Sequence, residues 1–419
     1  METVLDSFHR SSREPHVVFL DSVTGGLSLV ASRPRVLFSC NGRNVKIRWV
    51  DGRQQNFVAD PFEVLDDLLV SHRREAPDGM AIGYLGYELK DVIEKLPARA
   101  LNDVGLPDAW FGFYNHVNRF RIPASDAPTS RRADVSVPSS NFSRASYLAA
   151  VHRAKEYIAA GDIYQVNLSQ RFHAQTDASS LDLYQSLRSS NPAPFAAYLD
   201  LGDAQILSSS PESFLRLDNR RVITRPIKGT RPRLGDPDRD AITARELLTS
   251  VKDNAELLMI TDLLRNDIGR VCEFGSVHVP ELVRLEEYAT VFHLVSTIEG
   301  TLRPDISHVA ALRACFPGGS ITGAPKIRSM EIIDELEPHA RGVYTGVIGY
   351  FGYDGISHFN IAIRTMVKKG RDVYFHAGGG IVSDSDPAME YEETLAKARG
   401  MMAALEQLAT RRTVEVSNQ

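Results

Sequence analysis

The chain has 419 residues, of which 43% are hydrophobic, a composition that supports a substantial core in one large or two ordinary domains. The net charge is −5 and the basic residues are spread along the chain, which argues against a nucleic-acid partner. Three cysteines have no metal-type spacing, and no run approaches the roughly 18 apolar residues of a membrane span. We therefore expect a protein of the cytoplasm that acts on small molecules, away from membranes.

Three regions follow one another along the chain. Residues 1–120 predict short strands and turns, such as HVVFLDS and VLFSCNG, with one helix at PFEVLDDLLVSHRR. Residues 121–142 are rich in Pro, Ser and Asp and predict a linker or an excursion. Residues 143–410 open with a helix capped by Ser143 and stopped by Gly161. Strands and helices then alternate irregularly, which favours an α+β layered fold over a doubly wound parallel sheet.

Two predicted helices carry acidic faces. The apolar spacing of VKDNAELLMITDLLRND predicts a helix on which Asp253 and Glu256 share one face. The helix beginning at DPAMEYEETLAKA places Glu390 and Glu393 in the same way. Each pair alone is typical of a solvated surface. If the two faces oppose each other, their carboxylates provide the oxygen-rich environment that Mg²⁺ accepts.

Two glycine-rich segments are candidates for anion binding through backbone N–H groups. In CFPGGSITGAPKIRS the glycines precede a helix, but Ala324 and Pro325 stand where a P-loop requires Lys and Ser or Thr. A tight turn that caps a core helix is the alternative there. In HAGGGIV, the glycines 378–380 either form a bulge or let a ligand approach the backbone. Arg364, in the predicted strand NIAIRT, can pair with a carboxylate if it points into the same cleft.

The segment RPIKGTRPR places Lys228 between a proline-fixed strand end and a glycine turn, among arginines. Taken alone, it favours an exposed basic turn. Burial and nearby positive charge would instead lower the pKa of this lysine and make its amine a nucleophile. The motifs around the segment favour this second interpretation.

Seven motifs, in order between about residues 143 and 405, resemble the chorismate-utilising enzymes. They are GDIYQVNLSQ, SSSPESF, RPIKGTRPR, KDNAELLMITDLLRNDIGRV, FPGGSITGAPKIRSMEIIDELEP, NIAIRT and AGGGIVSDSDPAMEYEETLAKA. Residues 1–120 resemble the family more loosely, through FLDS, GYLGYE and PDAWFGFYN. The resemblance implies an anthranilate synthase component I-like layered α/β sandwich with a central substrate cleft, and a chorismate-binding catalytic domain over residues 143–410.

Two positions distinguish branches within this family. Members that add water carry a lysine base where this chain has Gln165, and a glutamine cannot deprotonate water. The ammonia-using branch resembles the chain at that position. Anthranilate synthases usually read PIAGT, whereas PIKGT, with Lys228, resembles aminodeoxychorismate synthase component I. Anthranilate synthase component I stays open as the alternative, because some members of the other branch lack the lysine. A non-catalytic tryptophan- or chorismate-binding subunit would have lost Glu212 or the acidic pairs, and this chain retains them.

The resemblance also implies roles for individual residues. Lys228 would attack C2 of chorismate while Glu212 protonates the departing C4 hydroxyl, and ammonia would then displace the lysine to give 4-amino-4-deoxychorismate, for 4-aminobenzoate and folate synthesis. His293 and Thr230 are further catalytic candidates. The Mg²⁺ ligands would be Glu256 and Glu393, supported by Asp253 and Glu390. The substrate-binding set is Arg364, Tyr344, Gly378, Gly379, Gly380, Gln165, Ser320 and Thr322.

Two partners besides chorismate follow from the same resemblance. Ammonia needs a source, and because the chain shows no nucleophile-elbow cysteine, a separate glutamine amidotransferase subunit is implied. Asp21 and Ser22, in FLDS, resemble a segment that binds tryptophan in relatives, as a regulator or as a structural ligand.

Overall fold

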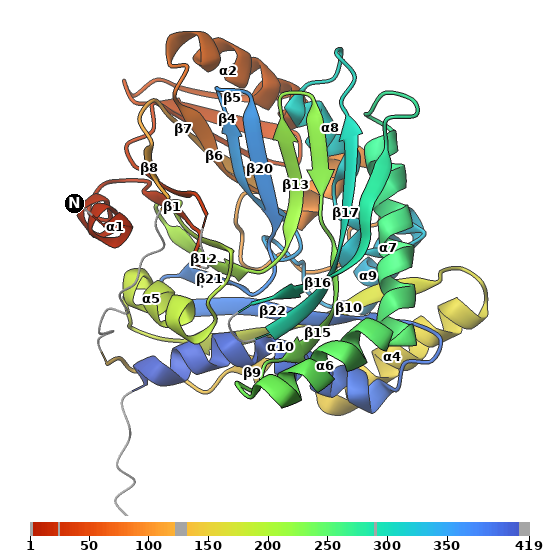
Figure 1. Ribbon diagram of the computed structural model, residues 1–419. Coiled ribbons are helices and arrows are strands. Elements are labelled where there is room, and N and C mark those ends of the chain that lie inside the picture. The colour runs from red at the N-terminus through yellow and green to blue at the C-terminus, as the bar shows by residue number, and fades with distance from the viewer. Residues whose placement is uncertain (1–2, 24–25, 122–131, 289–290, 410–419) are drawn as a thin grey trace, which may run out of the picture.

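The computed structural model describes residues 3–23, 26–121, 132–288 and 291–409. Within these ranges the strands form two antiparallel sheets of 10 and 12 strands, which face each other with helices packed on their outer sides (Figure 1). This layered arrangement confirms the α+β prediction. Of the linker predicted over residues 121–142, residues 122–131 lie outside the described residues, and the described remainder includes β9 (Ser139–Ser140).

The first sheet carries most of the glycine-rich and polar strands of the catalytic region. Its order is β18 (Gly323–Ala324), β10 (Gln165–Gln175), β22 (Asp372–Ile381), β21 (Thr365–Lys369), β12 (Ala204–Ser210), β11 (Phe195–Asp200), β1 (Val18–Asp21), β2 (Ser28–Ala31) and β8 (Asn118–Phe120), with β9 (Ser139–Ser140) paired to β10.

The second sheet carries the strand of Lys228 at one end. Its order is β15 (Ile227–Pro232), β17 (Val291–Thr301), β14 (Arg221–Thr224), β13 (Ser213–Asp218), β20 (Ile356–Ile361), β19 (Val347–Gly352), β6 (Met80–Leu85), β7 (Ala109–Tyr114), β3 (Val36–Asn41), β4 (Asn44–Trp49) and β5 (Gln54–Val58), with β16 (His278–Glu287) paired to β17. Strands from residues 1–120 therefore extend both sheets of the catalytic region.

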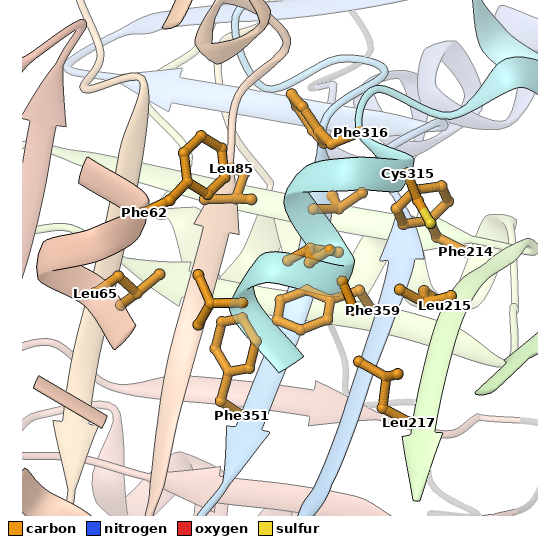
Figure 2. Close-up of a cluster of buried hydrophobic side chains, with 14 of the residues drawn as sticks. Phe62, Leu65, Leu85, Phe214, Leu215, Leu217, Cys315, Phe316, Phe351 and Phe359 are labelled. Carbon is orange, nitrogen blue, oxygen red and sulfur yellow. The ribbon is translucent and has the colours of Figure 1, made fainter. Parts of the chain in front are cut away.

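The helices cover the sheets and build separate hydrophobic layers. They are α1 (Val4–Ser11), α2 (Pro61–Glu75), α3 (Lys90–Ile93), α4 (Arg144–Ala159), α5 (Ser180–Ser190), α6 (Pro237–Thr249), α7 (Val251–Gly269), α8 (His308–Cys315), α9 (Lys326–Leu336) and α10 (Pro387–Leu408), with short 3₁₀ turns at η1 (Tyr87–Leu89) and η2 (Gly319–Ile321). Figure 2 shows the layer in which Phe62 and Leu65 of α2 and Cys315 of α8 pack against Phe351 and Phe359 of the second sheet. A different cluster fills the space between the sheets.

The predicted helix boundaries are confirmed. Ser143 caps α4 by accepting the Ser146 N–H, and Gly161 follows the helix with φ +82°. Asp386 caps α10 by accepting the Met389 N–H. The Asp386 cap fixes where α10 begins, and it therefore also fixes which residues of α10 face β22. None of the helices in the described ranges is long and apolar enough to cross a membrane.

Candidate active site

Lys228 stands at a bulge in β15, where pairing with β17 shifts register between Lys228 and Thr230. The intervening Gly229 has φ +71°, and a side chain there would lie 3.1 Å from Asp253 Cβ of α7. Glycine is therefore required both for the conformation and for the close approach of α7. At this bulge the Lys228 side chain is only 15% exposed, and its Nζ lies 3.9 Å from Glu256 Oε2.

Burial of the amine lowers the pKa of Lys228; the Glu256 carboxylate opposes this effect, and the Lys397 ammonium of α10 supports it. The arginines of RPIKGTRPR pair elsewhere: Arg225 with Glu286, Arg231 with Asp253, and Arg233 with Asp240. The positive charge that favours a neutral Lys228 thus comes from Lys397, a residue that we did not identify from the sequence.

Glu212 connects β12 to β13 and is 7% exposed. Its Oε1 accepts a 2.9 Å hydrogen bond from the Ser320 hydroxyl, in the glycine-rich segment before α9. Burial raises the pKa of Glu212 to about 7, although Ser320 and Lys228 both favour its ionised form. A carboxyl with this pKa can hold a proton near neutral pH, as a general acid must.

His293 of β17 faces Thr230, whose Oγ1 lies 2.9 Å from His293 Nδ1. Tyr288 packs edge-on against the imidazole at 5.4 Å. Burial lowers the pKa of His293 to about 4, and the Arg364 guanidinium adds to the decrease. His293 is therefore a neutral imidazole near pH 7, a group that orients by hydrogen bonding without carrying charge.

Arg364 follows β20 and adopts φ +51°, a left-handed conformation that few residues other than glycine take. Burial lowers the pKa of its guanidinium, and Glu212 opposes the decrease. The Arg364 guanidinium thus influences the pKa of His293, and the Glu212 carboxyl influences the pKa of Arg364. Among the described residues no carboxylate lies within ion-pair distance of Arg364, so the guanidinium is available to a substrate carboxylate.

Tyr344 lies beside β22 and is 6% exposed. Its ring stacks on His376 with centroids 5.0 Å apart and planes 13° apart. His376 stands two residues before Gly378 in β22, so Tyr344 borders the glycine strand. The stacked pair also lines a cavity that extends toward Glu88 and Asp108 of the N-terminal region.

Gln165 opens β10 and is completely buried, yet neither polar atom of its side chain has a hydrogen-bond partner among the described residues. A side chain at Gly380 would lie 2.6 Å from Gln165 Nε2, and one at Gly378 would lie 3.0 Å from Asn167 Oδ1, which also lacks a partner. Because buried polar groups are nearly always hydrogen-bonded, both amides are candidates to bind polar substrate groups. Our sequence interpretation missed Asn167, although it stands in the same YQVNLS motif.

Ser320 and Thr322 have different surroundings within one tight turn. Ser320 donates to Glu212, whereas the Thr322 hydroxyl donates 2.9 Å to Gly318 O inside the turn. At Gly323, with φ +147°, a side chain would lie 2.2 Å from Gln165 O. The glycine therefore allows this turn to pack directly against β10.

The acidic pair of α10 lies beside β22, whereas Glu256 of α7 lies beside Lys228. A side chain at Gly379 would lie 3.2 Å from Glu390 Oε2 and 3.3 Å from Glu393 Oε1, so both carboxylates face the same point of β22. Lys397 Nζ bridges Glu393 Oε1 at 2.8 Å and Gly378 O at 2.9 Å. Its position four residues after Glu393 is the i,i+4 signal that could have revealed it.

Electrostatics differ between the two carboxylates of α10. Burial raises the pKa of Glu390, and the neighbouring Glu393 adds to the increase. Burial also acts to raise the pKa of Glu393, but Lys397, Lys252 and Lys228 together bring it below its ordinary value. Glu393 is thus the more readily ionised of the two.

The chemistry of this donor set fits a hard divalent cation such as Mg²⁺. Carboxylate oxygens of Glu390 and Glu393 converge beside Gly379, and Glu256 and Glu393 both act on Lys228. Asp253 is engaged differently, because its Oδ2 accepts a 2.9 Å hydrogen bond from Arg231. No group of three or more metal-ligating side chains is assembled within the described ranges.

Asp21 and Ser22 lie at the end of β1, a strand of the first sheet, whereas Lys228 lies on β15 of the second. Asp21 is 2% exposed and accepts a 2.6 Å hydrogen bond from Arg188 Nε. Asp21 also lines a separate cavity together with Pro194, Tyr350 and His358 among others. The structure thus separates the predicted tryptophan segment from the residues around Lys228.

Comparison with known proteins connects this fold to one class. The pattern of the chorismate binding enzymes matches residues 17–403. The structure of anthranilate synthase component I from Streptococcus pneumoniae superposes with a TM-score of 0.80 and 32% identity, over 91% of this chain and 93% of that one. The fold is therefore that of anthranilate synthase component I, as the resemblance implied.

Curated relatives carry two different names. Aminodeoxychorismate synthase component 1 of Escherichia coli is 40% identical over 93% of this chain and 92% of its own length. Anthranilate synthase component 1 of Thermus thermophilus is 41% identical over 88% of this chain and 85% of its own length. The chain belongs to the chorismate-binding enzyme family, and overall identity does not separate the two activities.

Proposed function

We propose that the chain is an aminodeoxychorismate synthase component 1, which converts chorismate and ammonia to 4-amino-4-deoxychorismate. The observation that carries this proposal is Lys228, a buried lysine of lowered pKa beside the buried acid Glu212. A lowered pKa favours the neutral form of the amine, which is the nucleophilic form. Anthranilate synthase component 1 is the second candidate, supported by relatives of equal identity with that name.

In the proposed reaction Lys228 Nζ bonds to C2 of the ring, the ring double bonds shift, and the C4–O bond breaks. Glu212 donates its proton, so that the hydroxyl leaves as water. Ammonia then bonds to C4, the double bonds shift back, and the C2–N bond breaks to return the amine of Lys228. A proton from the ammonia nitrogen restores Glu212, which leaves the enzyme unchanged after one turnover.

The remaining residues bind and orient. Arg364 and the backbone of the glycines 378–380 would hold the enolpyruvyl carboxylate, and His293, aligned by Thr230, would stand beside the departing hydroxyl. Mg²⁺, held by Glu256 and Glu393 with Glu390 close by, would neutralise the ring carboxylate when bound. Ammonia would come from a separate glutamine amidotransferase subunit in the cytoplasm.

Product analysis tests the proposal. Purified chain is incubated with chorismate, Mg²⁺ and ammonium at mildly alkaline pH, with and without an aminodeoxychorismate lyase, and products are identified by chromatography and mass spectrometry. We expect 4-aminobenzoate only when the lyase is present. Anthranilate formed without the lyase would show that the chain is an anthranilate synthase and that PIKGT does not decide the product.

A further inference from the structure

One buried ion pair lies behind the substrate-binding segments, outside the reaction described above. The side chain of Arg341 is 1% exposed and that of its partner Glu337 is 3% exposed. Arg341 Nε and Nη2 donate to the two carboxylate oxygens of Glu337 at 2.8 and 2.7 Å, a bidentate pair. Arg341 lies between α9 and β19, just before the turn that contains Tyr344.

The remaining N–H groups of Arg341 reach three other segments. Nη1 donates to Ile321 O at 3.0 Å and to Thr345 Oγ1 at 3.3 Å, and Nη2 donates to Asn167 O at 2.8 Å. With the two bonds to Glu337, all five donors of the guanidinium are used. Lysine offers three donors from a single atom and cannot reproduce this set.

Each acceptor lies within two residues of one predicted to bind the substrate. Ile321 stands between Ser320 and Thr322, and Thr345 follows Tyr344. The third acceptor, Asn167 O, is two residues beyond Gln165 in β10.

Glu337 extends the network to the fourth segment. Its Oε1 accepts hydrogen bonds from the N–H of Ser169 at 2.7 Å and from the Ser169 hydroxyl at 2.9 Å. Ser169 is the register partner of Gly378 across β10 and β22. Through Ser169, the Arg341–Glu337 ion pair is therefore also connected to β22, the strand that carries the glycines 378–380.

The turn after Arg341 is strained where it meets this network. Thr345 has φ +61°, a conformation that side chains rarely adopt. Its hydroxyl accepts from Arg341, and its N–H donates to Ala362 O at 2.9 Å. Arg341 also lies 5.7 Å from the Tyr344 ring. Removing the guanidinium therefore frees the turn that sets the Tyr344 ring.

We propose that Arg341 is a positioning residue that holds the chorismate-binding half of the site in register. Within the described ranges its hydrogen bonds do not reach Lys228, and they approach Glu212 only indirectly, through Ser320 beside Ile321, so its loss should weaken substrate binding more than it disturbs the chemical groups. The inference rests on the proposed function only in taking chorismate as the substrate, which both candidate activities share.

The test is Arg341→Lys, with Arg171→Lys as the matched control. Arg171, on β10, is likewise a buried arginine: it is 7% exposed and makes a bidentate pair with Asp103 at 2.5 and 2.8 Å. We expect Arg341→Lys to raise the KM for chorismate roughly tenfold, with kcat within about threefold, because two buried carbonyls lose a donor. The KM for ammonium should stay unchanged, and Arg171→Lys should leave the chorismate KM near its wild-type value.

Two results would overturn the proposal. One is an equal rise of the chorismate KM in both variants at equal loss of thermal stability, which would show a general effect of losing a buried arginine. The other is a fall in kcat with an unchanged KM. If Arg341→Lys does not fold, Glu337→Gln replaces it, because this variant keeps the shape of the side chain and one acceptor. We expect Glu337→Gln to raise the KM for chorismate by a smaller factor. An unchanged KM for chorismate in Glu337→Gln would refute the positioning role of Arg341. Product identity is unaffected by either variant, so the outcome is separate from the test of the proposed function.

Discussion

Glu212→Gln should remove a pH-dependent destabilisation of the folded chain. The ordinary pKa of this carboxyl is 4.5, and burial raises it to about 7 in the folded state. Above pH 4.5 the unfolded chain loses this proton first, so unfolding becomes more favourable as pH rises through 7. Between pH 5 and 8.5, Glu212 should therefore lower the free energy of unfolding by about 2–3 kcal/mol, at 1.36 kcal/mol for each unit of pKa. For a chain of 419 residues, a change of this size in the unfolding free energy shifts the melting temperature by about 3 °C.

Thermal unfolding at pH 5 and pH 8.5, without chorismate or Mg²⁺, measures the effect. The melting temperature of Glu212→Gln should fall between the two pH values by about 3 °C less than that of the wild type. Glu63→Gln, at an exposed position of α2, controls for loss of an acidic group and should follow the wild type. If all three proteins change equally between the two pH values, Glu212 does not carry a proton at neutral pH and is no general acid.

Three other outcomes follow from the site. Lys228→Ala should lose amination by at least about a thousandfold while tryptophan fluorescence or calorimetry still detects chorismate binding, and retained turnover would exclude the covalent route. Removal of metal ions with a chelator should abolish turnover, and added Mg²⁺ should restore it. Glu256→Gln should need more Mg²⁺ for its half-maximal rate. A rate that does not change when the chelator is added would contradict the proposed metal ligands. Asp21→Asn should lower the unfolding free energy by about 2 kcal/mol, because the buried hydrogen bond from Arg188 loses its charged acceptor, and unchanged denaturant stability would contradict that pairing.

Local patterns predicted the helices and their ends well. Ser143 and Asp386 are polar residues placed before apolar periodic runs, and each caps the helix expected there. The acidic pairs on α7 and α10 also followed from helical spacing alone. That Glu256 and Glu393 belong to one site was implied only by the family resemblance, because spacing within a helix says nothing about which helix faces it.

Long-range pairing explains most of what the sequence left open. The arginines around Lys228 find carboxylates in other segments, such as Glu286 of β16 for Arg225, and no local pattern indicates those partners. Arg341 looks like an ordinary residue before a glycine turn, yet it lies at the junction of four segments. Residues of this kind are found only when the tertiary contacts are known.

The mixed origin of the two sheets bears on how the chain is made. Leu85 pairs with Val347 in one sheet, and Val18 pairs with Leu199 in the other. Strands near the N-terminus are therefore synthesised long before the strands with which they pair. At about 5–20 residues per second, β6 stays without β19 for roughly 13–50 s. During that time its apolar edge is open to wrong pairing, a hazard that follows from the topology itself.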